Sequence, residues 1–229
     1  MQAVSELFSS IQQTRHRKEI KVVVGGAEFG MKSIVSLATV SNLFAEDRPM
    51  IGSCVSAEID LSFLPGDYIP PRMAEIDVFV RVSNDESVSE WIPKGVYFTD
   101  TRTIDATTGV YTLHGYDAML KAEQDFVGDV VEGNWPRPVM DVVEEIAARM
   151  GVAIDPRTTL EDSFPVGLAF EYSCREVLGH IAAANAGNWI ITDAGMLRLV
   201  PLAETAERTS LLVDDLGDYL TFGGVRILV

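Results

Sequence analysis

The sequence predicts an α+β protein that is mainly β, with an N-terminal antiparallel β-barrel followed by a small α+β domain. Before residue 120, short stretches alternate apolar and polar residues with the period of two that is typical of half-buried strands. After residue 120, apolar residues recur at helical spacing. We therefore expect a helix and barrel over residues 1–120, and two helices and a β-hairpin over 121–205. Strands over 206–229 would begin a second barrel.

The first elements are a short helix and a hairpin. The apolar residues of Val4–Ile11 share one helical face, so this amphipathic helix would pack on its own domain or on a neighbouring chain. A strand over Ile20–Val24 runs into Gly25-Gly26, a dipeptide that favours hairpin turns, and Ala27–Phe29 would be the returning strand.

The clearest strands of the barrel are Cys54–Phe63 and Glu75–Val82, where apolar and polar residues alternate. Gly95–Thr103 and Val110–Gly115 would form a hairpin around a turn at 105–109. Many strands at short spacing, without a long helix between them, indicate an antiparallel barrel or strongly bent sheet. The residues expected to point inward are Val55, Ile59, Leu61, Ile76, Val78 and Val80.

Three helices follow. Asp117 would cap a short helix that extends to Glu123, and the prolines before Val139 introduce a second helix that Gly151 ends. In the third, Ser173 and Glu176 have the spacing of a capping box.

The remaining chain is expected to be β-structure. Gly187 should end the third helix, and Trp189–Thr192 and Met196–Val200 should form a β-hairpin. Strand-like stretches then occur at Leu211–Val213, Tyr219–Phe222 and Val225–Val229.

Charge excludes two classes of partner. The chain has 18 Lys and Arg against 34 Asp and Glu, a net charge of −16, and its one basic run is Arg15–Lys18. A surface that binds nucleic acid must release counterions from phosphates, so we expect no direct nucleic-acid binding. Attraction to anionic lipid is equally disfavoured, and no apolar run is long enough to insert in a membrane.

The two cysteines agree with synthesis in a reducing cytoplasm. Residues 1–18 do not have the order of a signal peptide, because their cations follow the apolar residues. Cys54 and Cys174 are expected to be buried thiols, with a disulfide or a reactive pair as the alternative.

No set of residues has the spacing of an active site, so we predict no catalytic, cofactor-binding or metal-binding residues. The three histidines lack metal-ligand spacing, and Gly25–Gly30 lacks the lysine of a phosphate loop. Carboxylate pairs are the groups that a glycosidase uses, and tryptophans can form a sugar-binding surface. Here these residues are better explained as solvated or core residues. The residues considered were His16, His114, His180, Cys174, Glu58, Asp60, Asp100, Asp105, Trp91, Trp135 and Trp189.

Three stretches together resemble the hub proteins of phage tails and baseplates, which are related to the base of type VI secretion spikes. The first is Ile51–Leu61, where small residues lead into an alternating strand. The second, Gly95–Leu120, has a Gly-aromatic strand, a Thr-rich hairpin and a Gly-Tyr-Asp turn. The third, Ser173–Leu197, has a helix and then a hairpin with an Asp-x-Gly-x-Leu turn.

The resemblance covers about residues 30–200 and implies a structural tail protein without catalysis. Hubs of this family are trimeric rings with two barrels per chain, which join the tail tube to the spike or tip. This sequence departs from that pattern because only one full barrel is expected in it. The resemblance implies self-association, tail-tube and spike partners, a place in the virion tail, and an acidic channel that repels DNA. A carbohydrate- or receptor-binding β-module is the alternative, followed by a cell-wall hydrolase.

Overall fold

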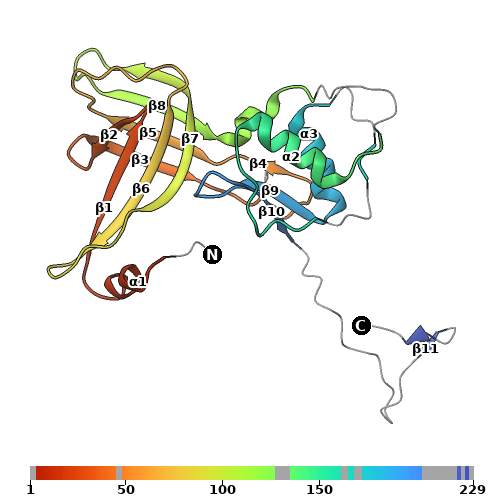
Figure 1. Cartoon of the computed structure of the whole chain (residues 1–229). Helices are drawn as coiled ribbons and strands as arrows, with labels where there is room; N and C mark the ends of the chain where they lie inside the picture. Colours follow the sequence, from red (N-terminus) through yellow and green to blue (C-terminus); the bar gives the residue numbers. More distant parts are fainter. Residues whose placement is uncertain are drawn as a thin grey trace, which may run out of the picture.

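The computed structural model of this chain shows a curled sheet beside a smaller α+β part (Figure 1). It describes residues 4–44, 48–126, 135–160, 165–167, 172–202, 221–222 and 225–226. The curled sheet and the smaller α+β part confirm the predicted fold class, which is α+β and mainly β. None of the helices in these ranges is long and apolar enough to cross a membrane.

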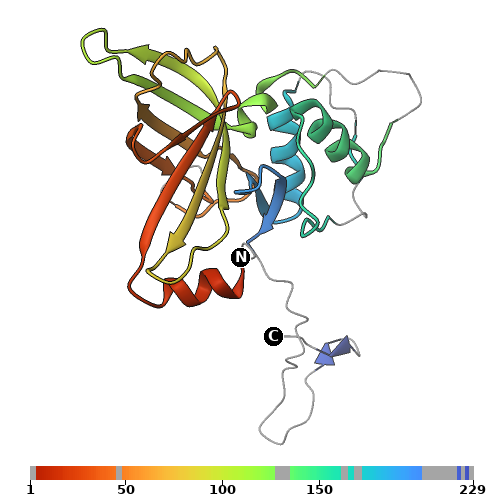
Figure 2. The same ribbon diagram turned by 60° about the vertical axis from the view of Figure 1, so that its left-hand side comes forward.

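Seven antiparallel strands build the curled sheet, in the order β2-β1-β6-β7-β8-β5-β3. The sheet forms a half-barrel whose two edges are β2 and β3 (Figures 1 and 2). The strand bounds are β1 Arg17–Val24, β2 Ala27–Gly30, β3 Ile34–Val40, β5 Glu58–Phe63, β6 Glu75–Ser83, β7 Ile92–Ile104 and β8 Tyr111–Asp117.

The predicted alternation identifies the buried face of this sheet. Five of the six residues expected to point inward lie in this sheet, with exposed fractions between 0% for Ile59 and 7% for Val80. The sixth, Val55, is 8% exposed but lies outside this sheet. Val22, Phe63 and Leu113 complete the centre of the core inside the curl. The sequence pattern does not predict β3, because residues on both of its faces are exposed and no alternation results.

The strand predicted over Cys54–Phe63 is two strands. Cys54–Val55 forms β4, which pairs in parallel with β9, Gly187–Ile191, in the smaller sheet. Glu58–Phe63 forms β5 in the curled sheet. The prediction of one strand was wrong because the alternation continues through Ser56 and Ala57, where the chain passes from one sheet to the other.

The smaller part packs helices on a three-stranded sheet of order β10-β9-β4. Its elements are the 3-10 helix η1 Ala118–Glu123, the helices α2 Val139–Met150 and α3 Cys174–Ala184, and β10 Leu197–Pro201. Its core includes Met119, Ile146, Leu178 and the fully buried Trp189. The division of the chain at residue 120 stays a prediction, and β4 is the strand from before it that lies in this second sheet.

The predicted helix signals are found with one correction. Asp117 caps η1, the Ser173–Glu176 capping box is formed, and Gly151 ends α2 with φ of 71°. However, α3 ends at Ala184 with Asn185 as its C-cap, and Gly187 is the first residue of β9. A Cβ at Gly187 would lie 2.7 Å from the carbonyl oxygen of Val200, so this glycine serves strand pairing instead.

The N-terminal helix α1, Glu6–Gln12, lies beside the end of β6 and buries Ile11. Val4, which precedes the helix, and Leu7, which lies within it, remain 41% and 44% exposed. At the other terminus, β11 Thr221–Phe222 pairs with β12 Val225–Arg226, within the two last predicted strand regions. The strand predicted at Leu211–Val213 lies outside the described residues.

Candidate functional site

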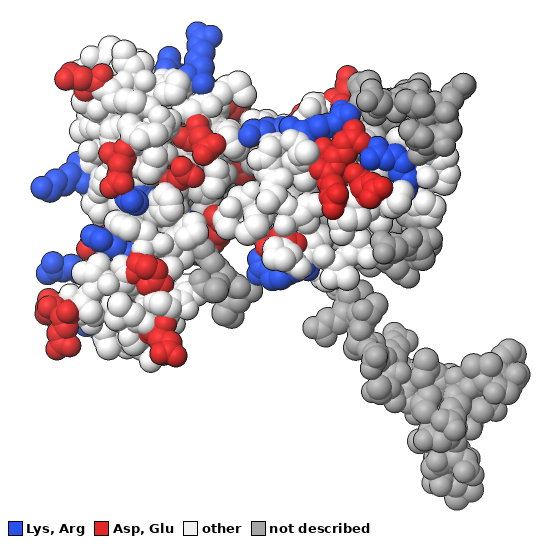
Figure 3. Space-filling view, in the orientation of Figure 1, with Lys and Arg blue, Asp and Glu red and all other residues white. Residues whose placement is uncertain are grey.

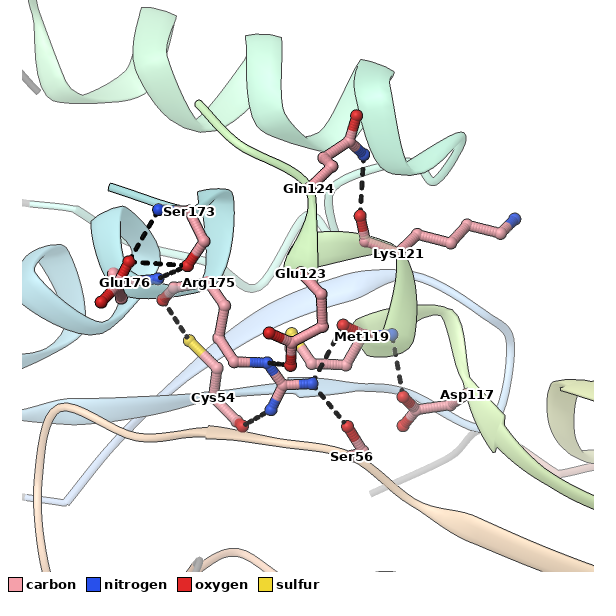
Figure 4. A network of polar contacts seen from close by, with 10 residues as sticks. All are labelled: Cys54, Ser56, Asp117, Met119, Lys121, Glu123, Gln124, Ser173, Arg175 and Glu176. Atoms are coloured by element: carbon pink, nitrogen blue, oxygen red, sulfur yellow. Dashed lines mark hydrogen bonds and ion pairs between the residues drawn. The ribbon is translucent and has the colours of Figure 1, made fainter. Parts of the chain in front are cut away.

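The three stretches that carry the family resemblance meet at the junction between the curled sheet and the α+β part (Figure 4). The first contributes the crossing from β4 to β5, the second contributes the end of β8 with η1, and the third contributes the start of α3. We regard this junction as the candidate site, because it sets how the two parts of the chain are held together.

Asp117 lies in this junction with only 3% of its surface exposed. One carboxylate oxygen accepts a hydrogen bond from the Ala57 amide at 2.7 Å, and the other accepts one from the Met119 amide at 2.9 Å. Burial raises the pKa of Asp117 to about 6, although these hydrogen bonds and the charge of Arg175 act in the opposite direction. The side chain therefore fixes the crossing and the first turn of η1 at once.

Arg175 reaches from α3 into the same junction. Its guanidinium donates to the Cys54 carbonyl at 2.8 Å, to the Ser56 hydroxyl at 2.9 Å and to the Met119 carbonyl at 3.1 Å. Its Nε also forms an ion pair with Glu123 at 2.6 Å. A planar guanidinium can satisfy several acceptors in one plane, and this one links α3 to β4 and η1.

Three glycines allow backbones to approach closely here. Gly52 has φ of 81°, and a Cβ on Gly179 of α3 would lie 2.9 Å from the Gly52 carbonyl oxygen. The first and third stretches therefore touch through their backbones. In the second stretch, a Cβ on Gly115 would meet the carbonyl oxygen of Phe98 in β7, which explains why the Gly-Tyr-Asp turn begins with glycine.

The cysteines behave as structural thiols. Both are free, Cys174 is buried, and the Cys54 thiol lies 3.3 Å from the Arg175 carbonyl oxygen that accepts its hydrogen bond. Burial raises the pKa of Cys54 to about 12 and also raises the pKa of Cys174. Neither thiol has the lowered pKa of a reactive nucleophile. Both thiols are unpaired, as expected, and Cys174 is buried, whereas Cys54 is only partly buried.

The three histidines lie in separate places. His16 is exposed and contacts the Thr14 carbonyl, His114 pairs with Asp60 at 2.9 Å, and His180 stacks edge-on against Tyr172. Among the described residues, no three His, Cys, Asp or Glu side chains come together in a way that could hold a metal ion.

The carboxylates considered for hydrolysis have structural roles or face solvent. Asp105 accepts from the Thr107 amide and the Thr108 hydroxyl, each at 2.8 Å, and these hydrogen bonds hold its pKa below the usual range. Asp100 and Glu58 are exposed, and Asp60 is the partner of His114. Gly25-Gly26, considered as part of a phosphate loop, forms the tight turn between β1 and β2.

The tryptophans do not offer a bare aromatic platform. Trp189 is fully buried and donates to the Leu178 carbonyl at 2.8 Å. The ring of Trp91 is covered by Arg81, 4.4 Å from its centroid, and by Lys21 at 5.0 Å. Trp135 is half-buried and packs edge-on against Phe126.

Charges of both signs are interspersed on the face drawn in Figure 3, where Lys and Arg lie between Asp and Glu over both parts of the molecule. On the α+β part, Glu145 pairs with Arg137 at 2.5 Å and with Arg149 at 2.6 Å. Basic side chains are therefore partly neutralised by acidic neighbours.

Sequence reasoning missed the role of Arg175, which links the third stretch to the first and the second. The only signal was a cation in the first turn of a helix, where the helix dipole favours an acidic side chain. Taken together, the junction offers close-packed backbones, one buried carboxylate and one guanidinium with three hydrogen bonds and an ion pair. Such an arrangement can hold two parts of a chain rigidly.

No protein-family model matches the chain, and no curated protein matches it in sequence. Two solved structures are similar in fold. The 43 kDa tail protein of prophage MuSo2 from Shewanella oneidensis has a TM-score of 0.56 and 14% identity over 91% of this chain and 62% of its own. A tail protein from Neisseria meningitidis MC58 has a TM-score of 0.51 and 14% identity over 85% of this chain and 58% of its own. The chain spans about three-fifths of their length, and its fold is that of these tail proteins.

Proposed function

We propose that the chain is a structural component of a phage or prophage tail, and specifically of the baseplate hub that joins the tail tube to the spike or tip. The observation that carries the proposal is the fold likeness to two tail proteins, which extends over 91% and 85% of this chain. The three hub-like stretches converge on one junction, which supports the same role.

The finer proposal is a trimeric ring, which needs heterologous contacts between neighbouring copies. The β3 edge supports it. This seven-residue strand carries no charge and no proline, and its Val35 and Val40 are 58% and 51% exposed. Such an edge invites pairing unless another chain covers it. Tail-tube and spike proteins are the other proposed partners, in a virion tail assembled in the bacterial cytoplasm.

We infer a role without catalysis. The thiols have raised pKa values, and the carboxylates considered for hydrolysis cap a turn or lie on exposed faces. A carbohydrate-binding surface would need an accessible aromatic face, and the three tryptophans do not supply one. No observation favours either alternative function over the tail role.

Deletion of the gene from the phage or lysogen that encodes it tests the proposal. We expect induced lysates to contain filled heads without complete tails by negative-stain electron microscopy, and antibody against this protein to label the tail end in the parent. A plasmid copy should restore plaque formation. Normal, infectious tails in the deletion strain would overturn the proposal.

Trimer formation is measured separately, by light scattering on the full-length protein with and without its tail-tube protein. A mass of three chains supports the ring. A monomer at all concentrations and with the tube protein present would contradict the hub assignment while leaving a different tail role open.

A further inference from the structure

The loop before β6, residues 64–74, presents the two most exposed of the large apolar side chains in the described part of the chain. Ile69 is 68% exposed and Met73 is 69% exposed. Met73 has φ of 53°, a left-handed conformation that is uncommon and strained for a residue other than glycine. The fold therefore holds two large apolar side chains toward solvent, one of them on a strained backbone.

This loop is fixed to the strands around it. The Tyr68 hydroxyl donates to the Val24 carbonyl at 2.7 Å, and the Arg102 guanidinium donates to the Pro70 carbonyl. Pro70 itself is buried, although Ile69 beside it is not. A surface that is already ordered loses little conformational entropy when a partner covers it, so this loop is preorganised for binding.

An apolar groove of about 550 Å³ lies between α1 and the opposite end of the curled sheet. Val80, Val82 and Ile92, each at most 7% exposed, form its floor. Val4 and Phe8 form one wall, and 41% of the surface of Val4 is exposed. The groove belongs neither to the junction described above nor to the β3 edge.

Both sides of the groove are anchored. Ser5 caps α1 and also donates to the Glu90 carboxylate, from its amide at 2.9 Å and from its hydroxyl at 2.7 Å. On the opposite side, Lys94 and Asp193 form an ion pair at 3.1 Å that connects β7 to the turn before β10. The groove is therefore a built feature of the fold.

The loop and the groove lie at opposite ends of one strand. β6 begins at Glu75, directly after the loop, and reaches the groove floor at Val82. The seven steps between these residues span about 23 Å. Both views show α1 beside the far end of β6 (Figures 1 and 2). A loop therefore cannot enter the groove of its own chain, and the two surfaces can meet only between copies, as a heterologous contact requires.

The charges beside the two surfaces are also complementary. Lys18 lies directly opposite Val82 in the β1–β6 pairing and lines the groove. It is exposed and makes no ion pair with a carboxylate in the described part of the chain. Glu75, two positions after Met73, is exposed beside the loop. Opposite charges at the rims of two apolar surfaces favour one orientation of contact.

We propose that the loop over residues 64–74 of one copy docks in the α1 groove of a second copy, with Ile69 and Met73 in the groove and Glu75 toward Lys18. Each copy then offers its loop to one neighbour and its groove to another. The inference rests on the proposed ring, for which it names a contact between neighbouring copies.

Mixed crosslinking of the full chain tests the contact. Gln12→Cys places a thiol on the groove lining, and Arg72→Cys places one next to Met73. When the two variants are mixed, a short bismaleimide should join one chain of each into a dimer. Each variant alone should give little dimer, because a groove meets a loop and never another groove. The parent, in which burial raises the pKa of Cys54 and Cys174, measures the background.

Further substitutions separate a specific contact from chance encounters. Ile69→Asp with Met73→Asp on the loop variant should lower the yield of mixed dimer several-fold. Ile51→Asp is the matched control, because Ile51 is 51% exposed and lies outside both surfaces. Lys18→Glu on the groove variant should also lower the yield, and Glu75→Lys on the loop variant should then restore it. Thermal melts confirm that each variant is folded.

The inference and the proposed function fail separately. Absence of the mixed dimer, or a yield that ignores Ile69→Asp with Met73→Asp, would overturn this contact. Equal dimer from Arg72→Cys alone would do the same, because it indicates a symmetric contact. A trimer by light scattering without the mixed crosslink would remove this contact and leave the ring. Normal tails in the deletion strain would instead overturn the tail role, whatever the crosslink shows.

Discussion

The carboxylate of Asp117 accepts a hydrogen bond from the Ala57 amide at 2.7 Å, while the Asp117 amide donates to the Ala57 carbonyl at 3.0 Å. The last residue of β8 thus holds the place where the chain leaves the smaller sheet and enters the curled one. The same carboxylate caps η1. A single buried acid therefore connects the two parts of the molecule, and its ionisation should be measurable as stability.

Asp117→Asn should change how stability depends on pH. Burial raises the pKa of Asp117 to about 6 in the folded chain, from an ordinary value of 3.8. The native state therefore binds this proton before the unfolded state does as pH falls. The Asp117 contribution to the free energy of unfolding should rise between pH 7 and pH 4, by at most about 3 kcal/mol, and should level off below.

The measurement is urea unfolding of parent and variant across that pH range. The stability difference, parent minus Asp117→Asn, should grow as pH falls. Asp67→Asn, at an exposed position, is the control and should follow the parent. A parent-minus-variant difference that shrinks toward pH 4 would show that the folded-state pKa is lowered instead.

Arg175→Lys should destabilise the chain by about 1–3 kcal/mol, because an ammonium group cannot reach the acceptors on Cys54, Ser56 and Met119 together. Thermal and urea unfolding measure the loss. Arg72→Lys, at an exposed position, should stay within about 0.5 kcal/mol of the parent. Equal stability of the two variants would mean that the hydrogen bonds of Arg175 contribute nothing to the free energy of unfolding.

Gly115→Ala tests the physical reason for the Gly-Tyr-Asp turn. The added methyl group would meet the Phe98 carbonyl oxygen, a backbone atom that cannot rotate away. We expect a cost of at least about 2 kcal/mol in urea unfolding. Gly30→Ala is the matched control in β2, because a Cβ there has no atom within 4 Å. If both variants unfold at the same urea concentration, β7 and β8 approach less closely than described.

Ile59→Ala tests the buried face of the curled sheet. Ile59 has no exposed surface, so its truncation should cost about 2–5 kcal/mol, whereas Val35→Ala at an exposed position should cost little. Ile59→Asp should fail to fold at neutral pH, because it buries an unpaired charge. Circular dichroism melts separate these outcomes, and an Ile59→Asp variant that melts like the parent would reverse the two faces.

Both thiols should resist alkylation in the folded chain. Burial raises the pKa of Cys54 to about 12, so almost no thiolate exists at pH 8. Iodoacetamide at pH 8 should label neither cysteine natively and both in urea, as followed by mass spectrometry. Rapid native labelling of Cys54 would show that the junction opens often.

Local sequence signals predicted the elements whose causes are local. The Ser173–Glu176 capping box, the Gly151 helix end and the alternation of Glu75–Val82 each depend on neighbours in sequence. The split of Cys54–Phe63 depends on β9, a strand far along the chain, so no local pattern marks it. Arg175 was missed for the same reason, since its acceptors come from two other stretches.

The parallel pairing of β4 with β9 has a consequence for how the protein forms. Ser53 and Asn188, which are 135 positions apart, are joined by a hydrogen bond at 2.9 Å beside this pair. During synthesis β4 must therefore wait until almost the whole α+β part has left the ribosome. Such distant contacts slow folding, because a long loop must close before they are made. We expect the curled sheet to assemble earlier and β4 to pair with β9 last, so that completion of the fold depends on the later half of the chain.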